Sequence, residues 1–166
     1  MIGYRPAMPE QSLEQRFFAI RIIYLALVLT LGVYGFVAYQ NVTRASPHAL
    51  DPTLLYALIG VAVMEMVGLP FLRRMLLPPM APPRSLDDKV AIEGAVANTA
   101  FAKYFTTNMI TWAICESIAM YGLVLVFMSG DVRYYGPFAC VALLNFLVYR
   151  PSLDDLQAVV RAAKSS

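Results

Sequence analysis

The chain has 166 residues, of which 59% are hydrophobic and only 14% are charged, and its formal net charge is +2. Soluble domains carry roughly 25% charged residues, so this composition excludes an ordinary soluble domain. The small net charge gives no sign of a nucleic-acid partner. We therefore expect an all-α integral membrane protein. The alternative, a soluble four-helix core, needs polar outer helix faces that the apolar segments of this chain lack.

The first two apolar segments cover residues 17–39 and 53–72. Each reaches the ~20 residues that an α-helix needs to cross a bilayer. Sixteen residues of mixed polarity precede the first segment, which is also longer than the apolar core of a signal peptide. We interpret it as a retained transmembrane helix. The second segment is expected to end near Pro70, and the two helices form a first hairpin within residues 1–77.

A proline-rich linker and a further helix are expected in residues 78–103. Serine is a preferred N-cap, and acidic residues in the first turn favour the helix dipole, so Ser85-Leu86-Asp87-Asp88 predicts a helix start at Ser85. The apolar residues Val90, Ala97 and Phe101 recur at roughly helical spacing. We expect an amphipathic cytoplasmic helix that lies at the membrane interface or on a partner and runs into the third span.

The remaining apolar segments, residues 104–128 and 132–149, predict the third and fourth transmembrane helices. Together with the C-terminus they form a second hairpin within residues 104–166. The string Ser-Leu-Asp-Asp occurs again from Ser152, directly after Pro151, and predicts a short C-terminal helix. The apolar residues of that helix share one face: Leu153, Leu156 and Val160.

The two hairpins resemble each other in sequence. Tyr34-Gly35-Phe36-Val37 aligns with Tyr121-Gly122-Leu123-Val124, and the same alignment superposes Arg16-Phe17-Phe18 on Lys103-Tyr104-Phe105. The whole chain is therefore predicted to be one membrane domain built as two repeated hairpins. Chance similarity between apolar helices is the alternative.

Basic residues are placed unevenly along the chain. Most lie in the N-terminus, the central linker or the C-terminus: Arg5, Arg16, Arg73, Arg74, Arg84, Lys89, Lys103, Arg150, Arg161 and Lys164. The other two loops hold Arg44 and Arg133. Because cytoplasmic loops are enriched in Lys and Arg, this pattern predicts a multi-pass inner-membrane protein with both termini in the cytoplasm.

Four polar residues are predicted to form one layer inside the membrane: Arg21, Glu65, Asn108 and Asn145. Counted along their helices, each lies roughly 6–9 Å from the cytoplasmic boundary, at ~1.5 Å per residue. In one interpretation Arg21 pairs with Glu65 and the asparagines bond between helices. In another, Arg21 reaches to the lipid headgroups. A functional alternative is an entry point for a proton or a polar headgroup.

Glu116 is predicted to lie deeper, roughly 18 Å into the third span by the same rise. An ionised carboxyl near the bilayer centre costs about 2.5–3.5 kcal/mol on insertion scales, so such residues are rare and usually functional or paired. We expect a protonated carboxyl that forms a proton, ion or hydrogen-bond site with Thr30, Tyr34 and Tyr121. The alternative is a hydrogen bond that only holds the helices together.

The run Glu116-Ser117-Ile118-Ala119-Met120-Tyr121-Gly122-Leu123-Val124 resembles the ion-carrying helix of the proteolipid subunits of rotary ATPases, especially the duplicated vacuolar type. In that family a membrane-embedded Glu is followed at similar spacing by Tyr-Gly-Leu, in a chain of two hairpins. The resemblance implies that Glu116 is a reversible proton or sodium site. The family also has a glycine-rich helix and short hairpin loops, whereas this chain has nine scattered glycines and a long proline-rich linker.

The sequence contains no motif that links a nucleophile to a base, so we expect no enzymatic activity. No cofactor or metal site is predicted either, because His48 is the single histidine and lies in a loop. Cys115 and Cys140 lie within predicted helices and are expected to be free thiols. The first hypothesis is a non-catalytic accessory or structural subunit of a membrane complex, for example an energy-transducing one. The second is a proton- or ion-conducting protein. Its partners would be the lipid bilayer and other membrane subunits or further copies of itself.

Overall fold

The computed structural model describes residues 13–42, 49–76 and 89–165, and these residues form helices without any strand. The helices are α1 (Leu13–Val42), α2 (Pro52–Leu76), α3 (Lys89–Ser129), the short 3-10 helix η1 (Val132–Tyr134), α4 (Tyr135–Val148) and α5 (Leu153–Ser165). The expectation of an all-α protein is confirmed for this part of the chain. Arg5, Arg44, His48 and the predicted cap at Ser85 lie outside the described residues.

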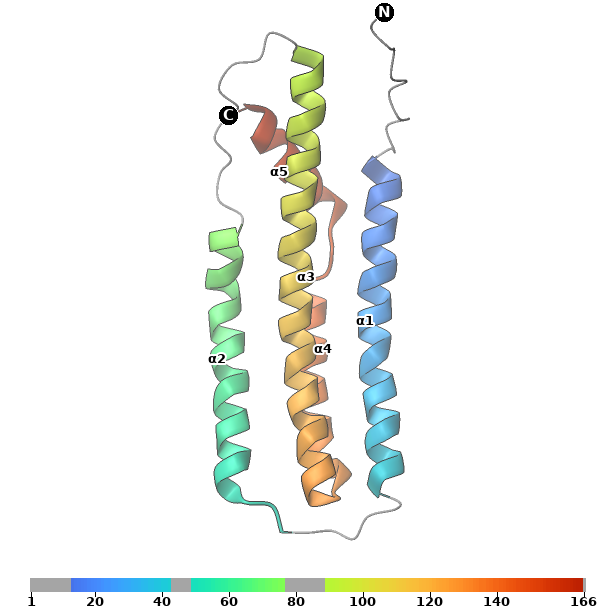
Figure 1. The fold of residues 1–166 in the computed structure, drawn as a ribbon, viewed down its shortest axis with the longest axis vertical. Coiled ribbons are helices and arrows are strands. Elements are labelled where there is room, and N and C mark those ends of the chain that lie inside the picture. Colours follow the sequence, from blue (N-terminus) through green and yellow to red (C-terminus); the bar gives the residue numbers. More distant parts are fainter. Residues whose placement is uncertain (1–12, 43–48, 77–88, 166) are drawn as a thin grey trace, which may run out of the picture.

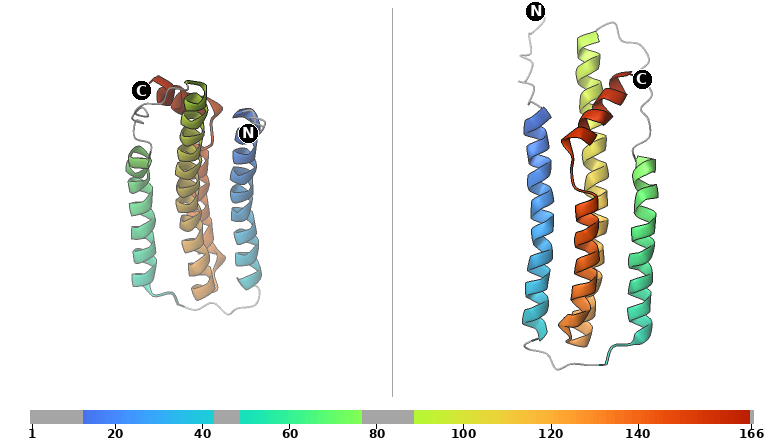
Figure 2. Two further views of the ribbon diagram at one scale, coloured as in Figure 1. Left: turned by 45° about the horizontal axis from the view of Figure 1, so that its top comes forward. Right: turned by 180° about the vertical axis from the view of Figure 1, so that it is seen from behind.

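The α3 helix is the centre of the molecule. It contacts α1, α2, α4 and α5, and the views agree that α1 and α2 lie on opposite sides of the α3–α4 pair (Figure 1, Figure 2). The α1 and α3 helices run in one direction, and α2 and α4 run in the other (Figure 1). We call the end at which α1 begins, α2 ends and α5 lies the basic end, because Arg16, Arg73, Arg74 and Arg150 are there.

Three helices, α1, α2 and α3, are long and apolar enough to cross a membrane, so three of the four expected spans are candidate membrane-spanning helices. The α4 helix has 14 residues, about 21 Å at 1.5 Å per residue, which is less than the ~30 Å bilayer core. It counts as a fourth span only together with α5, from which it is separated by a bend of 51°.

The bend between α4 and α5 follows from the local sequence. Pro151 has no backbone N–H with which to continue α4, and Ser152 begins the next helix as expected. The Ser152 hydroxyl lies 3.5 Å from the Asp155 backbone nitrogen that it caps. The Tyr104 hydroxyl of α3 holds the turn, since it donates to the Ser152 carbonyl at 3.0 Å and accepts from the Ser152 N–H at 3.2 Å. On the predicted apolar face, Leu156 is fully buried in the hydrophobic core.

The helix expected before the third span is part of α3, which agrees with its predicted course into that span. The α3 helix runs from Lys89 to Ser129 as one continuous helix of 41 residues (Figure 1). No proline falls between these two residues, so nothing removes a hydrogen bond from its ladder. At 1.5 Å per residue the helix is about 60 Å long, roughly twice the thickness of a bilayer core.

The α2 helix also extends beyond its predicted end. Pro70 lies inside the helix, which continues to Leu76. A proline interrupts one backbone hydrogen bond, but membrane helices tolerate this because local adjustments satisfy the freed carbonyl. Because α2 is about a turn and a half longer than expected at this end, Glu65 lies farther from the basic end, and so deeper in the bundle, than predicted.

The α3 and α4 helices are in close contact at Gly122. A Cβ atom at this position would lie 2.8 Å from Phe138 Cβ and 3.2 Å from Tyr135 Cα. The first distance is shorter than real Cβ atoms adopt and the second is tight, so this close approach favours glycine. The α3 helix ends at Ser129 and is followed by Gly130, whose φ of 69° lies in the left-handed region that glycine adopts without strain. The chain then turns back through η1 into α4.

Candidate carboxyl–hydroxyl sites

Glu116 of α3 faces α1, where two hydroxyls meet one of its oxygens. The Tyr34 hydroxyl donates to Glu116 Oε1 at 2.6 Å, and Thr30 Oγ1 lies 3.1 Å from the same atom. Thr30 and Tyr34 are four residues apart and so lie one above the other on the same helix face. Among the described residues no donor reaches the second oxygen, Oε2.

Glu65 of α2 forms a similar cluster with the opposite side of α3. The Tyr121 hydroxyl donates to Glu65 Oε1 at 2.6 Å, and Ser117 Oγ lies 2.9 Å from Glu65 Oε2. Ser117 and Tyr121 are again four residues apart on one face. Unlike Glu116, Glu65 therefore has a hydroxyl partner at each of its two oxygens.

Thr30 and Ser117 each contact a backbone carbonyl of their own helix as well as a carboxyl. Thr30 Oγ1 is 2.6 Å from the Leu27 carbonyl oxygen, and Ser117 Oγ is 2.7 Å from that of Ile114. A hydroxyl carries a single hydrogen, so it cannot donate to a backbone carbonyl and to a carboxylate at the same time. Each hydroxyl is therefore shared between a carboxyl and the backbone of its own helix.

In both clusters the residue that follows the tyrosine is a glycine. A Cβ atom on Gly35 would lie 3.2 Å from the Tyr135 ring of α4, and Gly122 meets the Tyr135 backbone. Each Tyr-Gly pair thus binds a carboxyl with the tyrosine and approaches α4 with the glycine. The alignment that superposes Tyr34 on Tyr121 also superposes the hydroxyl residues Thr30 and Ser117.

The structure brings Thr30 and Tyr34 to Glu116 but directs Tyr121 elsewhere. Glu116 and Tyr121 are five residues apart on α3, and at 3.6 residues per turn their side chains point about 140° apart. Tyr121 therefore bonds Glu65 of α2, whereas Glu116 faces α1. Sequence proximity on one helix was a poor guide to which carboxyl the tyrosine meets.

The structure does not bring Arg21 and Glu65 together. Arg21 belongs to α1 and Glu65 to α2, and these helices are separated by α3 and α4 (Figure 2). Because α2 continues through Pro70, Glu65 is deeper than expected. At the end of the bundle opposite the basic end, α2 begins at Pro52 and α3 ends at Ser129. Glu65 and Glu116 are each 13 residues from these positions, so each lies about 20 Å from that opposite end at ~1.5 Å per residue.

The two asparagines of the predicted polar layer bond within their own helices. Asn108 donates to the Tyr104 carbonyl at 2.8 Å, and Asn145 donates to the Val141 carbonyl at 2.9 Å. The buried Asn108 Oδ1 has no hydrogen-bond partner among the described residues. These side-chain amides therefore bond within their own helices and do not donate the expected bonds between helices.

Ser117 is a site residue that the sequence analysis did not single out. The available signal was the internal alignment, which pairs it with Thr30. Glu65, Glu116, Tyr34 and Tyr121 are all half-buried. They lie where α1 and α2 meet α3, outside the tightly packed contact between α3 and α4.

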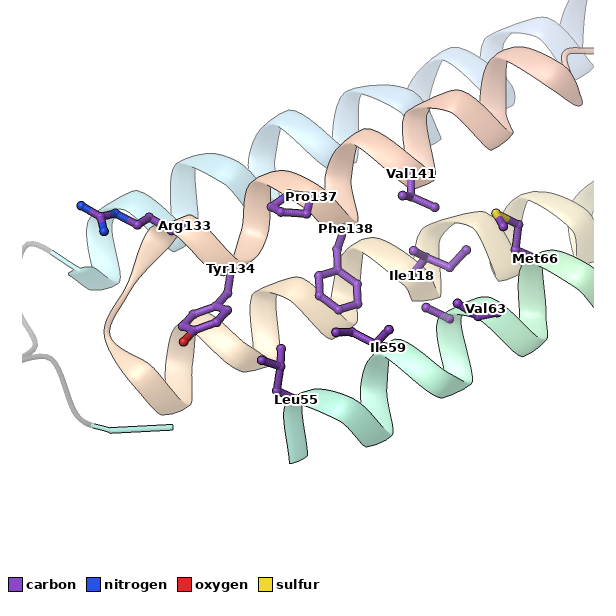
Figure 3. Close-up of a pocket in the computed structure, with 11 residues that line it drawn as sticks. Leu55, Ile59, Val63, Met66, Ile118, Arg133, Tyr134, Pro137, Phe138 and Val141 are labelled. Carbon is purple, nitrogen blue, oxygen red and sulfur yellow. The ribbon is translucent and has the colours of Figure 1, made fainter. Parts of the chain in front are cut away.

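An apolar cavity of about 390 Å³ separates α2 from α4, with α3 beneath it. Figure 3 shows Ile59 and Val63 of α2 facing Phe138 of α4 and Ile118 of α3, with Arg133 at one end. The remaining lining residues are Leu55, Ala62, Met66, Tyr134, Pro137 and Val141. This volume lies in the ~300–1,000 Å³ range of ligand pockets.

The described residues contain no group of histidine, cysteine or acidic side chains that could hold a metal ion. Within the same residues Cys115 is buried and Cys140 is exposed, and both are free. Comparison with family models, with curated proteins and with solved structures finds no match to this chain. Function is therefore inferred from the two carboxyl–hydroxyl clusters and the surfaces around them.

Proposed function

We propose that the protein is a non-catalytic subunit of a membrane complex, with its basic end in the cytoplasm. The observation that carries this proposal is the position of Glu65 and Glu116. Carboxyls inside membranes almost always face a protein interior or a water-filled cavity. Here both are only half-buried at the seams where α1 and α2 meet α3. Another subunit, or a second copy of this chain, would complete their burial.

The cavity between α2 and α4 supports the same proposal. Helices associate in membranes chiefly through close packing, and an unfilled apolar cavity forfeits dispersion contacts along its walls. The α2 helix packs chiefly against α3, and within the described part of the chain no helix fills the space beside Ile59 and Val63. Side chains of a partner helix that enter this cavity would supply the missing contacts.

The subunit proposal is tested by blocking the cavity. Val63 lines the cavity and is half exposed, so Val63→Trp fills it without entering the α2–α3 contact. Met64 is the adjacent exposed residue outside the lining, and Met64→Trp is the matched control. Each variant is extracted from its native membrane in mild detergent, and the protein mass of the particle is measured by light scattering.

We expect the unaltered chain to extract as a particle much heavier than the 18.4 kDa monomer. Val63→Trp should release the monomer with unchanged helical circular dichroism, whereas Met64→Trp should keep the heavy particle. A monomeric unaltered chain would contradict the proposal, and so would equal effects of the two substitutions. The measurement is then repeated on the purified protein. A heavy particle there indicates self-association, whereas a monomer indicates that the partner is a different subunit.

A second candidate function is proton or ion transfer at Glu116. The specific observation in its favour is Glu116 Oε2, which accepts no hydrogen bond from a described residue although the carboxyl is half-buried in the bundle. The resemblance of residues 116–124 to the ion-carrying helix of proteolipid subunits favours the same site. Proton exchange requires a carboxyl with one oxygen open to a donor or acceptor, and Glu116 meets that requirement better than Glu65 does.

Proton transfer is tested in liposomes that contain the purified protein and a pH-sensitive dye. Under this hypothesis Glu116→Gln abolishes the protein-dependent proton flux while the particle mass is retained, and Glu65→Gln lowers the flux less. Flux equal to that of protein-free liposomes would exclude conduction by the isolated chain. Normal flux and normal assembly in Glu116→Gln would remove any functional role from this residue.

A further inference from the structure

Among the described residues Arg21 of α1 has no acidic partner. The Glu65 carboxyl lies on the far side of the α3–α4 pair and bonds Tyr121 and Ser117. The Arg21 guanidinium instead lies over the Phe17 ring, at 5.9 Å from the centroid. A charge held at the edge of the membrane region in this way is available to an external anion.

A second arginine reaches the same place from another part of the chain. Arg21 and Arg150 both line a cavity of about 290 Å³ between α1 and the bend that joins α4 to α5. Both side chains are exposed. Arg150 lies two residues after the end of α4, and Pro151 fixes the direction of the chain after it. The fold therefore places two guanidinium groups, far apart in sequence, at the wall of one cavity at the basic end.

The rest of the cavity wall is apolar, and it continues along α1. Phe18, Ile22 and Leu25 line the cavity and are 64%, 52% and 56% exposed. Their spacing of four and three residues places them in one stripe on the helix face. With Leu29, which is 71% exposed, the stripe runs from the arginines toward the middle of the bundle. A ligand for this surface needs an anionic head and an apolar chain.

We propose that an anionic phospholipid binds here, with its phosphate between Arg21 and Arg150 and an acyl chain along the α1 stripe. Arginine presents several N–H donors that match phosphate oxygens, and basic pockets between membrane helices bind anionic headgroups. A free phosphate would satisfy the arginines but would leave the apolar stripe unused. The acids closest to Arg150 in sequence, Asp154 and Asp155, are exposed at the start of α5, and in the described part of the chain neither forms an ion pair with the two arginines.

The test measures lipid retained by the purified full-length protein. The protein is exchanged into detergent with defined phosphatidylglycerol or phosphatidylcholine, and bound lipid is counted by native mass spectrometry. The variants are Arg21→Gln, Arg150→Gln and the double substitution. Arg74→Gln is the matched control, because Arg74 is exposed at the same end but does not line this cavity. Arg21→Lys and Arg150→Lys keep the charge if a glutamine variant does not fold.

We expect phosphatidylglycerol to be retained in preference to phosphatidylcholine. Each glutamine substitution should weaken retention about fivefold, which corresponds to ~1 kcal/mol per basic residue near a membrane surface. The lysine variants and Arg74→Gln should retain the lipid. Equal retention by Arg21→Gln and the unaltered protein would overturn the proposal, as would an equal loss in Arg74→Gln. Displacement of the lipid by glycerol phosphate alone would show a phosphate site and overturn it too.

Discussion

Glu65 and Glu116 lie at the same depth on two sides of α3, and yet their hydrogen bonding differs. Glu65 meets Tyr121 with one oxygen and Ser117 with the other, whereas Glu116 receives Tyr34 and Thr30 at a single oxygen. The first cluster is closed, since both oxygens have partners. The second leaves Oε2 without a partner among the described residues. The same residue pattern therefore produces one carboxyl suited to fastening helices and one able to bind a further group.

The helices α1 and α2, which these hydrogen bonds join to α3, also differ in their other contacts. The α1 helix has additional contacts with α4, where the Tyr135 hydroxyl donates to the Leu31 carbonyl and the Tyr24 hydroxyl donates to that of Phe146. The α2 helix packs chiefly on α3 alone. Glu65 should therefore contribute more to the stability of the bundle than Glu116 does.

Substitution of Glu65 is expected to have the largest effect. Glu65→Ala removes two contacts that join α2 to α3, and bonds between membrane helices contribute ~0.6–1.7 kcal/mol each, so the loss should be about 1–3 kcal/mol. Glu116→Ala should cost less, because α1 keeps its bonds to α4. Thermal unfolding in detergent measures both. An equal or larger loss in Glu116→Ala would contradict the assignment of Glu65 as the structural carboxyl.

The glycines beside the two tyrosines provide the next comparison. Gly122→Ala places a methyl group 2.8 Å from Phe138 Cβ and should destabilise by about 1–3 kcal/mol through overpacking. Gly35→Ala meets the edge of the Tyr135 ring at 3.2 Å, and a small shift of that ring should lower the cost. At Gly32 a Cβ atom would have no neighbouring heavy atom within 4 Å, so Gly32→Ala is the control for helix propensity. Unfolding midpoints in the order Gly32→Ala above Gly35→Ala above Gly122→Ala are expected, and a reversed order would show that α4 does not approach Gly122 this closely.

Removal of single tyrosine hydroxyls is expected to have a smaller effect. Tyr121→Phe and Tyr34→Phe each delete one donor to a carboxyl, at a cost of ~0.6–1.7 kcal/mol. A double-mutant cycle of Tyr121→Phe with Glu65→Ala should show coupling between the two residues. The cycle of Tyr121→Phe with Glu116→Ala should be additive, since the side chains point to different helices. Coupling in the second cycle would contradict the separation of the clusters.

Hydropathy alone predicted much of the fold. The segment 17–39 lies within α1, and the segment 53–72 lies within α2, because long apolar runs leave few alternatives to a membrane helix. The ends were less predictable. Pro70 suggested a helix end, and yet α2 continues past it. The helix expected before residue 104 was predicted to run into the third span, and α3 is indeed continuous from Lys89.

The candidate sites were predicted only in part. Thr30 and Tyr34 were expected near Glu116 because their helix positions matched its depth, and they lie there. Glu65 and Tyr121 were assigned to the wrong neighbours. Hydropathy gives neither the rotation of a helix about its axis nor which helices are adjacent, and these two properties decide which carboxyl a hydroxyl meets.

The difference between an open and a closed carboxyl is tested most directly by chemical labelling. A hydrophobic carbodiimide reacts with a protonated carboxyl that has an accessible oxygen, and mass spectrometry of the digested protein locates the adduct. We expect Glu116 to be modified faster than Glu65 in the intact protein, with Tyr121→Phe raising the rate at Glu65. Modification of Glu65 at the same rate as Glu116, or faster, would contradict the assignment of Glu116 as the open carboxyl.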